Sequence, residues 1–156
     1  MPIELNEPLV VGISATALFD LSEADRVFQE KYESDPDTAI DEYRSYMLAR
    51  EDEALEDGTG MPLIRSLLNL NSHQTDKGAD PIVEVVIISR HSPETGFRVL
   101  KEIRRRKLPI TRSAFTAGES SSNYLDAFYV DLFLTTNEKD AQEVIDSKVC
   151  AAALVK

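Results

Sequence analysis

The chain has 156 residues, with 17 lysines and arginines against 28 aspartates and glutamates and a formal net charge of −11. This acidic balance argues against general binding to nucleic acid or to an anionic lipid surface. No stretch approaches the ~20 apolar residues that span a bilayer, and the N-terminus lacks the pattern of a secretion signal, so we expect a cytoplasmic protein.

Five short apolar runs predict five β-strands. Three of them are nearly continuous in valine, isoleucine, leucine and alanine, which is typical of parallel strands covered on both faces. The last run contains Cys150, the single cysteine, which we interpret as a small buried apolar residue. The predicted strands are residues 9–14, 82–89, 110–115, 131–135 and 149–155.

The long first connection holds three predicted helices. Residues 22–32 and 36–50 form an acidic helical pair, with Ile40, Tyr43 and Met47 on one apolar stripe. We interpret residues 21–58 as a helical cap inserted over the carboxyl edge of the sheet.

The crossover helix back to the sheet is predicted at residues 61–70. It carries four apolar residues at core spacing. These are Leu63, Ile64, Leu67 and Leu68. The chain is then one domain, residues 1–156, with its core at about residues 8–20 and 59–156.

A further helix begins at Pro93 with Ser92 as its N-cap, and we expect it to bury Phe97, Leu100 and Ile103. Its basic end, residues 104–107, is typical of a solvated last turn that complements the helix dipole. Two more connections, residues 120–128 and 137–147, carry the remaining helices.

Strands joined by right-handed helical crossovers predict an α/β fold, a three-layer doubly wound sandwich with a mainly parallel five-stranded sheet. Ligands of such sheets bind beyond the carboxyl ends of the strands. We therefore expect residues 14–20, 89–92 and 135–140 to converge at the functional site.

Five stretches of this chain carry a resemblance to a known family. They are LVVGISATALF (9–19), YRSYMLAREDEALEDGTGMP (43–62), VEVVIISRHSPETGFR (83–98), ITRSAFTAG (110–118) and YLDAFYVDLFLTTNEKDA (124–141). Through them the chain resembles the N-terminal half of the type I cytosolic 5′-nucleotidases, a branch of the haloacid dehalogenase superfamily. The resemblance implies a nucleoside 5′-monophosphate as ligand and Mg²⁺ as cofactor.

The superfamily motifs survive only in part in this chain. Ile13 and Ala15 stand where the catalytic carboxylates align best, and no cation stands near Ser121, where the resemblance implies a lysine. Thr135-Thr136 replaces the aspartate pair that binds Mg²⁺. Ser89 matches the phosphate-binding position. The family's acidic nucleophile loop belongs to a half that we expect after Lys156.

Phosphoryl transfer needs a nucleophile in line with phosphorus and a cation that offsets the developing charge. Ile13 and Ala15 supply neither, so we expect this chain to be inactive alone. One interpretation is part of a 5′-nucleotidase that pairs with a second similar half or with itself through an apolar face. The other is a non-catalytic module that binds a nucleotide or a protein partner.

The candidate phosphate-binding residues are polar side chains at the ends of the first two strands. They are Ser14, Thr16, Ser89, Arg90 and His91. An alternative remains that Ser89 only caps a turn and that Arg90 pairs with an acidic neighbour. A metal site is conceivable from three acidic residues, Asp20, Glu138 and Asp140.

Overall fold

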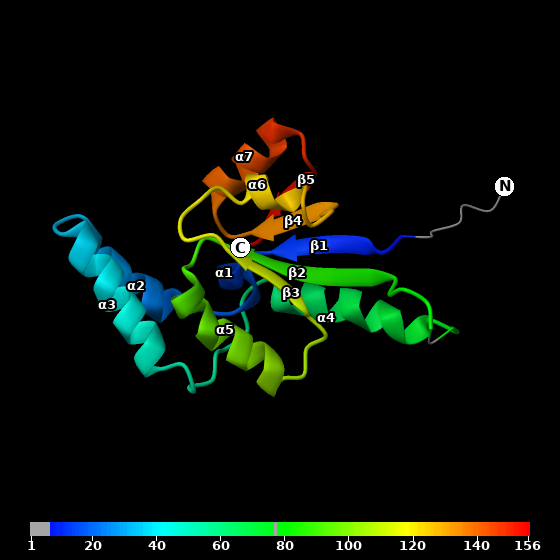
Figure 1. The fold of residues 1–156 in the computed structure, drawn as a ribbon, viewed down its shortest axis with the longest axis horizontal. Coiled ribbons are helices and arrows are strands. Elements are labelled where there is room, and N and C mark those ends of the chain that lie inside the picture. Colours follow the sequence, from blue (N-terminus) through cyan, green and yellow to red (C-terminus); the bar gives the residue numbers. More distant parts are fainter. Residues whose placement is uncertain (1–6, 77) are drawn as a thin grey trace.

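A computed structural model describes residues 7–76 and 78–156 of the chain. Its centre is an all-parallel five-stranded sheet in the order β3-β2-β1-β4-β5, which confirms the predicted α/β class (Figure 1). The strands are β1 Leu9–Ile13, β2 Val83–Ser89, β3 Arg112–Phe115, β4 Leu132–Thr135 and β5 Ala151–Leu154.

Helices connect consecutive strands, and the predicted helices are all present. Two short helices in the described residues were not predicted: α1, a single turn that follows β1 directly and is capped by the Ser14 hydroxyl, and the 3₁₀ helix at Leu70–His73. The helices are α1 Ala15–Leu18, α2 Ser22–Tyr32, α3 Pro36–Ala49, α4 Met61–Asn69, the 3₁₀ helix η1 Leu70–His73, α5 Pro93–Arg105, α6 Ser122–Leu125 and α7 Glu138–Ser147.

The sheet is covered on both faces, as the continuous apolar strands predict. Adjacent residues of β1 illustrate this: Val11 packs in the apolar cluster shared with α4 and α5, while Val10 packs in the cluster shared with α6 and α7. Figure 1 shows the same division, with α4 and α5 below the sheet and α6 and α7 above it. Two hydrophobic layers thus fix the central strands.

Three apolar residues expected in the core are instead exposed: Ile40 at 45%, Leu63 at 43% and Phe97 at 50%. Helix α5 buries Val99 and Ile103 on its inner side. Residues four apart share a helix face, and Phe97, two residues before Val99, points about 160° away from that face. The apolar identity of Phe97 therefore misled the prediction.

The basic end of α5 is mostly exposed, as predicted: Arg104, Arg105 and Lys107 are exposed and Arg106 is half-buried. Arg105 and Arg106 both pair with Glu102, at 2.6 and 2.7 Å, and Glu102 is buried on the inner side of the helix. Because an unpaired buried carboxylate is costly, these two cations stabilise Glu102 in addition to complementing the dipole.

The order of the strands creates a switch point. The chain steps outward from β1 to β2 and β3, then returns to the other side of β1 with β4. At such a point the connections leave in opposite directions and open a crevice at the carboxyl edge. The helices α2 and α3 depart from this edge after β1, and the chain returns through Gly58 and Gly60.

The chain segment that returns to the sheet at Gly58 and Gly60 packs closely against α1. The amides of Gly58 and Gly60 donate to the carbonyls of Leu18 and Ala17 at 2.9 and 2.7 Å. A Cβ on Gly58 would lie 2.5 Å from the Ala17 carbonyl oxygen, so glycine is needed for this close approach.

Within residues 7–76 and 78–156, no helix has the length and apolar character to cross a membrane.

Candidate phosphate-binding site

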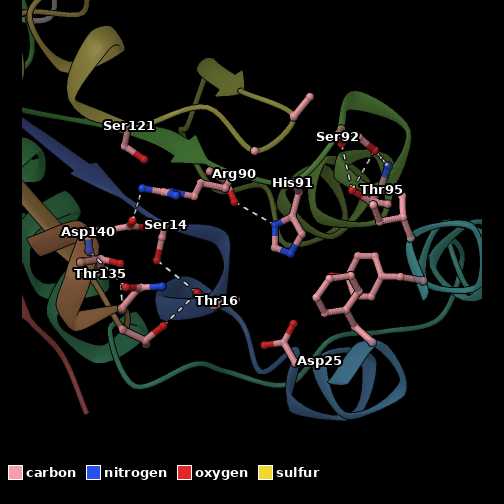
Figure 2. A pocket seen from close by; sticks show the side chains of 18 of the residues that line it. Ser14, Thr16, Asp25, Arg90, His91, Ser92, Thr95, Ser121, Thr135 and Asp140 are labelled. Carbon is pink, nitrogen blue, oxygen red and sulfur yellow. Dashed lines mark hydrogen bonds and ion pairs between the residues drawn. The ribbon is translucent and has the colours of Figure 1, made fainter. Parts of the chain in front are cut away.

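A cavity of about 880 Å³ opens at the carboxyl edge of the sheet. One wall consists of the ends of β1, β2 and β4 with their loops, and the other consists of α2 and α3. Figure 2 shows the side chains of both walls facing a common space. This volume is in the range of pockets that hold a small organic ligand.

All of the candidate phosphate-binding residues line this cavity. They are Ser14, Thr16, Ser89, Arg90 and His91. Among the three metal candidates, Asp140 lines it as well, whereas Asp20 lines a separate hollow beside α2.

Hydroxyl groups form one end of the cavity. Ser14 Oγ lies 3.3 Å from Thr16 Oγ1, and Thr16 Oγ1 lies 2.9 Å from Thr136 Oγ1 after β4. The Ser14 hydroxyl also accepts from the Ala17 amide at 3.3 Å. These groups can donate to an anion or accept from a ligand by rotating the hydroxyl.

Ser89 and His91 form a polar pair at the end of β2. Ser89 Oγ lies 2.8 Å from Nδ1 of His91, two residues further along the chain. Burial lowers the pKa of His91 to about 4, which keeps the ring neutral at pH 7. A neutral imidazole retains one donor and one acceptor nitrogen.

The backbone of this pair is fixed by the loop after β3. The amides of Thr116, Ala117 and Gly118 donate to the carbonyls of Ser89, His91 and Arg90 at 2.8, 3.1 and 2.8 Å respectively. Ala117 and Gly118 adopt left-handed φ angles of 52° and 93°. This turn aims successive amides at one segment and holds the β2 loop in place.

Arg90 pairs with acidic residues of α7, as the alternative interpretation predicts. Its Nη2 lies 2.5 Å from Asp140 Oδ1 and donates to Glu143 Oε2 at 3.0 Å. Burial raises the pKa of Asp140, and the nearby Arg90 guanidinium opposes that shift. Glu143 carries no motif and was missed by the sequence reasoning.

The acidic residues at this edge do not fit a Mg²⁺ site. In the described part of the chain, no three histidine, cysteine, aspartate or glutamate residues are grouped so that they could hold a metal ion. Asp20 accepts from the Ser22 amide at 2.9 Å, Glu138 is exposed, and Asp140 is engaged by Arg90. Mg²⁺ requires carboxylate oxygens in near-octahedral geometry, which these separated groups do not offer.

The wall from α2 and α3 contributes aromatic rings. Tyr43 stacks on His91, with 5.7 Å between ring centroids and 4° between planes, and Phe28 meets Tyr43 edge-on at 5.8 Å. Tyr43 was predicted as a core residue of α3, which is correct for its 8% exposure, but its place in the cavity wall was missed. Helical spacing cannot tell a core aromatic from one that faces a ligand.

Asp25 adds a half-buried acid to the same wall. Burial raises its pKa, with a smaller contribution from the charge of Asp20. Burial also raises the pKa of the Tyr43 phenol, so burial disfavours the charged form of both groups. An apolar aromatic wall therefore faces a hydroxyl-rich wall across the cavity.

A doubly wound parallel sheet with its ligand cavity at the switch point defines a Rossmann-like domain, consistent with the haloacid dehalogenase superfamily. The family model of the 5′-nucleotidases matches residues 1–156. The chain therefore belongs to the 5′-nucleotidase family. No solved structure matches the chain.

Proposed function

We propose that the cavity binds a nucleoside 5′-monophosphate and that this chain does not hydrolyse it alone. The observation that carries the proposal is the end of β1, where Ile13 and Ala15 are both 0% exposed. They stand where the attacking and assisting carboxylates of the superfamily align best. A loop without these groups retains binding but loses several orders of magnitude in rate.

The two walls suggest how the ligand lies. The hydroxyls of Ser14, Thr16 and Ser89 suit the phosphate at the sheet edge. The stacked Tyr43 and His91 rings suit the apolar faces of a base. The chain would then contribute nucleotide contacts beside a catalytic half with an acidic loop, in the cytoplasm.

Two measurements on the isolated chain test this proposal. Phosphate release is measured with AMP, IMP and Mg²⁺, and we expect none above the uncatalysed rate. Thermal unfolding is then measured with increasing AMP, and we expect a rise, because a ligand at a hundred times its Kd adds about 2.7 kcal/mol to the free energy of unfolding.

Ser89→Ala tests the site itself. Loss of one hydroxyl contact should weaken AMP binding about three- to tenfold, which corresponds to the net value of one hydrogen bond. Ser66→Ala is the matched control, since the Ser66 hydroxyl donates to the Pro62 carbonyl on the exposed side of α4. Phosphate release that disappears in Ser89→Ala would contradict the proposed inactivity. No thermal shift with any nucleotide would instead favour a protein-interaction module.

A further inference from the structure

Arg90 has N–H donors at the sheet edge that its two ion pairs do not use. Its contacts with Asp140 and Glu143 both use Nη2. Its Nε is buried and has no hydrogen-bond partner among the described residues. Because a guanidinium carries five N–H donors, engagement of one nitrogen leaves part of the group for a ligand.

The two carboxylates hold Arg90 to different degrees. The Asp140 side chain is 9% exposed, whereas the Glu143 side chain is 38% exposed. Glu143 also accepts from the Ser120 hydroxyl at 3.1 Å, which gives it a second partner. Separating a buried ion pair is more costly than separating an exposed one. An incoming anion would therefore displace Glu143 and leave Asp140 in place.

Arg90 contacts Asp140, one of the three acidic residues considered for a metal site. Asp140 follows β4 closely, and Figure 2 shows the Arg90 side chain extending to it between Ser14 and Ser121. The carboxylate that could hold a cation is thus already occupied by a guanidinium. Such a group supplies a fixed positive charge and a fork of donors that matches phosphate oxygens.

We propose that the Arg90 guanidinium supplies the positive charge of this site and binds the nucleotide phosphate without a divalent metal. Asp140 holds the guanidinium in position through an ion pair. Glu143 forms a second ion pair with it, which the incoming phosphate displaces. This inference rests on the proposed nucleotide binding and specifies how the phosphate is held.

The test is isothermal titration of the chain with AMP, once with EDTA and once with Mg²⁺. We expect the two Kd values to agree within about twofold. Arg90→Gln should weaken binding about tenfold or more, because it removes charge-assisted hydrogen bonds. Arg90→Lys keeps the positive charge but loses the planar set of N–H donors of the guanidinium. Its Kd for AMP should therefore lie between those of the wild type and Arg90→Gln.

Glu143→Gln gives the most specific result. It removes the competing negative charge while leaving an oxygen for Ser120, so we expect AMP to bind severalfold more tightly. Asp146→Asn is the matched control, since it removes an exposed carboxylate from the same helix, and its Kd should stay within about twofold. Circular dichroism of each variant verifies the fold. Glu143→Gln also keeps the test decisive if Arg90→Gln, which leaves Asp140 unpaired, does not fold.

The outcomes separate the two proposals. AMP binding that needs Mg²⁺, or that ignores both Arg90 and Glu143 substitutions, overturns the role of Arg90 but leaves nucleotide binding standing. No AMP binding by the wild type or by Glu143→Gln, with or without Mg²⁺, overturns the proposed function and this inference with it.

Discussion

His91 shows how one half-buried side chain couples this site to pH. Its ring lies between the Ser89 hydroxyl and the Tyr43 ring and is kept neutral by burial, which lowers its pKa to about 4. In the unfolded chain a histidine titrates near its ordinary pKa of about 6.5. The two states therefore bind different numbers of protons between these values.

The sign of the effect follows from this difference. Between about pH 6.5 and pH 4 the unfolded chain takes up a proton that the folded chain does not, so the free energy of unfolding falls as the pH falls. The contribution of His91 amounts to at most about 3 kcal/mol across the window. His91→Gln, which keeps an acceptor for Ser89, should remove this contribution.

Urea unfolding of both proteins at pH 8, 6, 5 and 4 measures it. We expect the wild type to lose stability relative to His91→Gln as the pH falls, with a constant difference above pH 7. Parallel profiles at all four pH values would contradict the burial of a neutral ring.

Residue types in the sequence identified the hydroxyl and basic members of the site but not their partners. Ser89 and Arg90 could be predicted because the end of a buried parallel strand faces the ligand edge. Glu143 and Tyr43 could not, since each lies on a helix face whose orientation depends on tertiary packing. The contact between Arg90 and Asp140 likewise joins segments 50 residues apart.

At the scale of elements, the tight return of the chain at Gly58 holds the α2–α3 wall to the sheet. Gly58→Ala would place Cβ at 2.5 to 2.8 Å from backbone atoms of Ala17, Leu18 and Phe19, which cannot move without shifting α1. We expect a loss of about 1–3 kcal/mol in the free energy of unfolding. Gly78→Ala is the control, because its nearest neighbour is an Asp76 side-chain atom at 3.4 Å in a surface turn.

Chemical denaturation of the two variants measures the difference. Gly78→Ala should stay within about 0.5 kcal/mol of the wild type. Equal denaturation midpoints for Gly58→Ala and the wild type would show that the chain at Gly58 does not pack closely against α1.

Element positions could be predicted well because apolar runs and capping residues are local signals. The Ser92 cap is an example, since its hydroxyl accepts from the Thr95 amide at 3.4 Å. Strand ends were less exact: β3 begins at Arg112 rather than residue 110, and β5 begins at Ala151 rather than residue 149. An edge strand pairs on one side only, so its length depends on the neighbouring strand as well as on its own residues.

At the scale of the whole molecule, an apolar group remains exposed at the amino edge of the sheet. Leu9 and Ile82 are 42% and 41% exposed and adjacent, since the Leu9 amide donates to the Ile82 carbonyl at 2.9 Å. We expect the chain to self-associate or to pair with a similar half through an apolar face. Sedimentation velocity over a hundredfold range of concentration measures self-association, and a monomer independent of concentration would contradict it.

We propose above all that the cavity at the sheet edge is a nucleotide-binding site. The most direct measurement is an ¹H–¹⁵N NMR titration of the chain with AMP in the presence of EDTA. We predict that the shifted amides cluster at residues 14–16, 89–92 and 135–137, the loops that line the cavity. A saturating titration with no shifts, or with shifts confined to other surfaces, would contradict the claim.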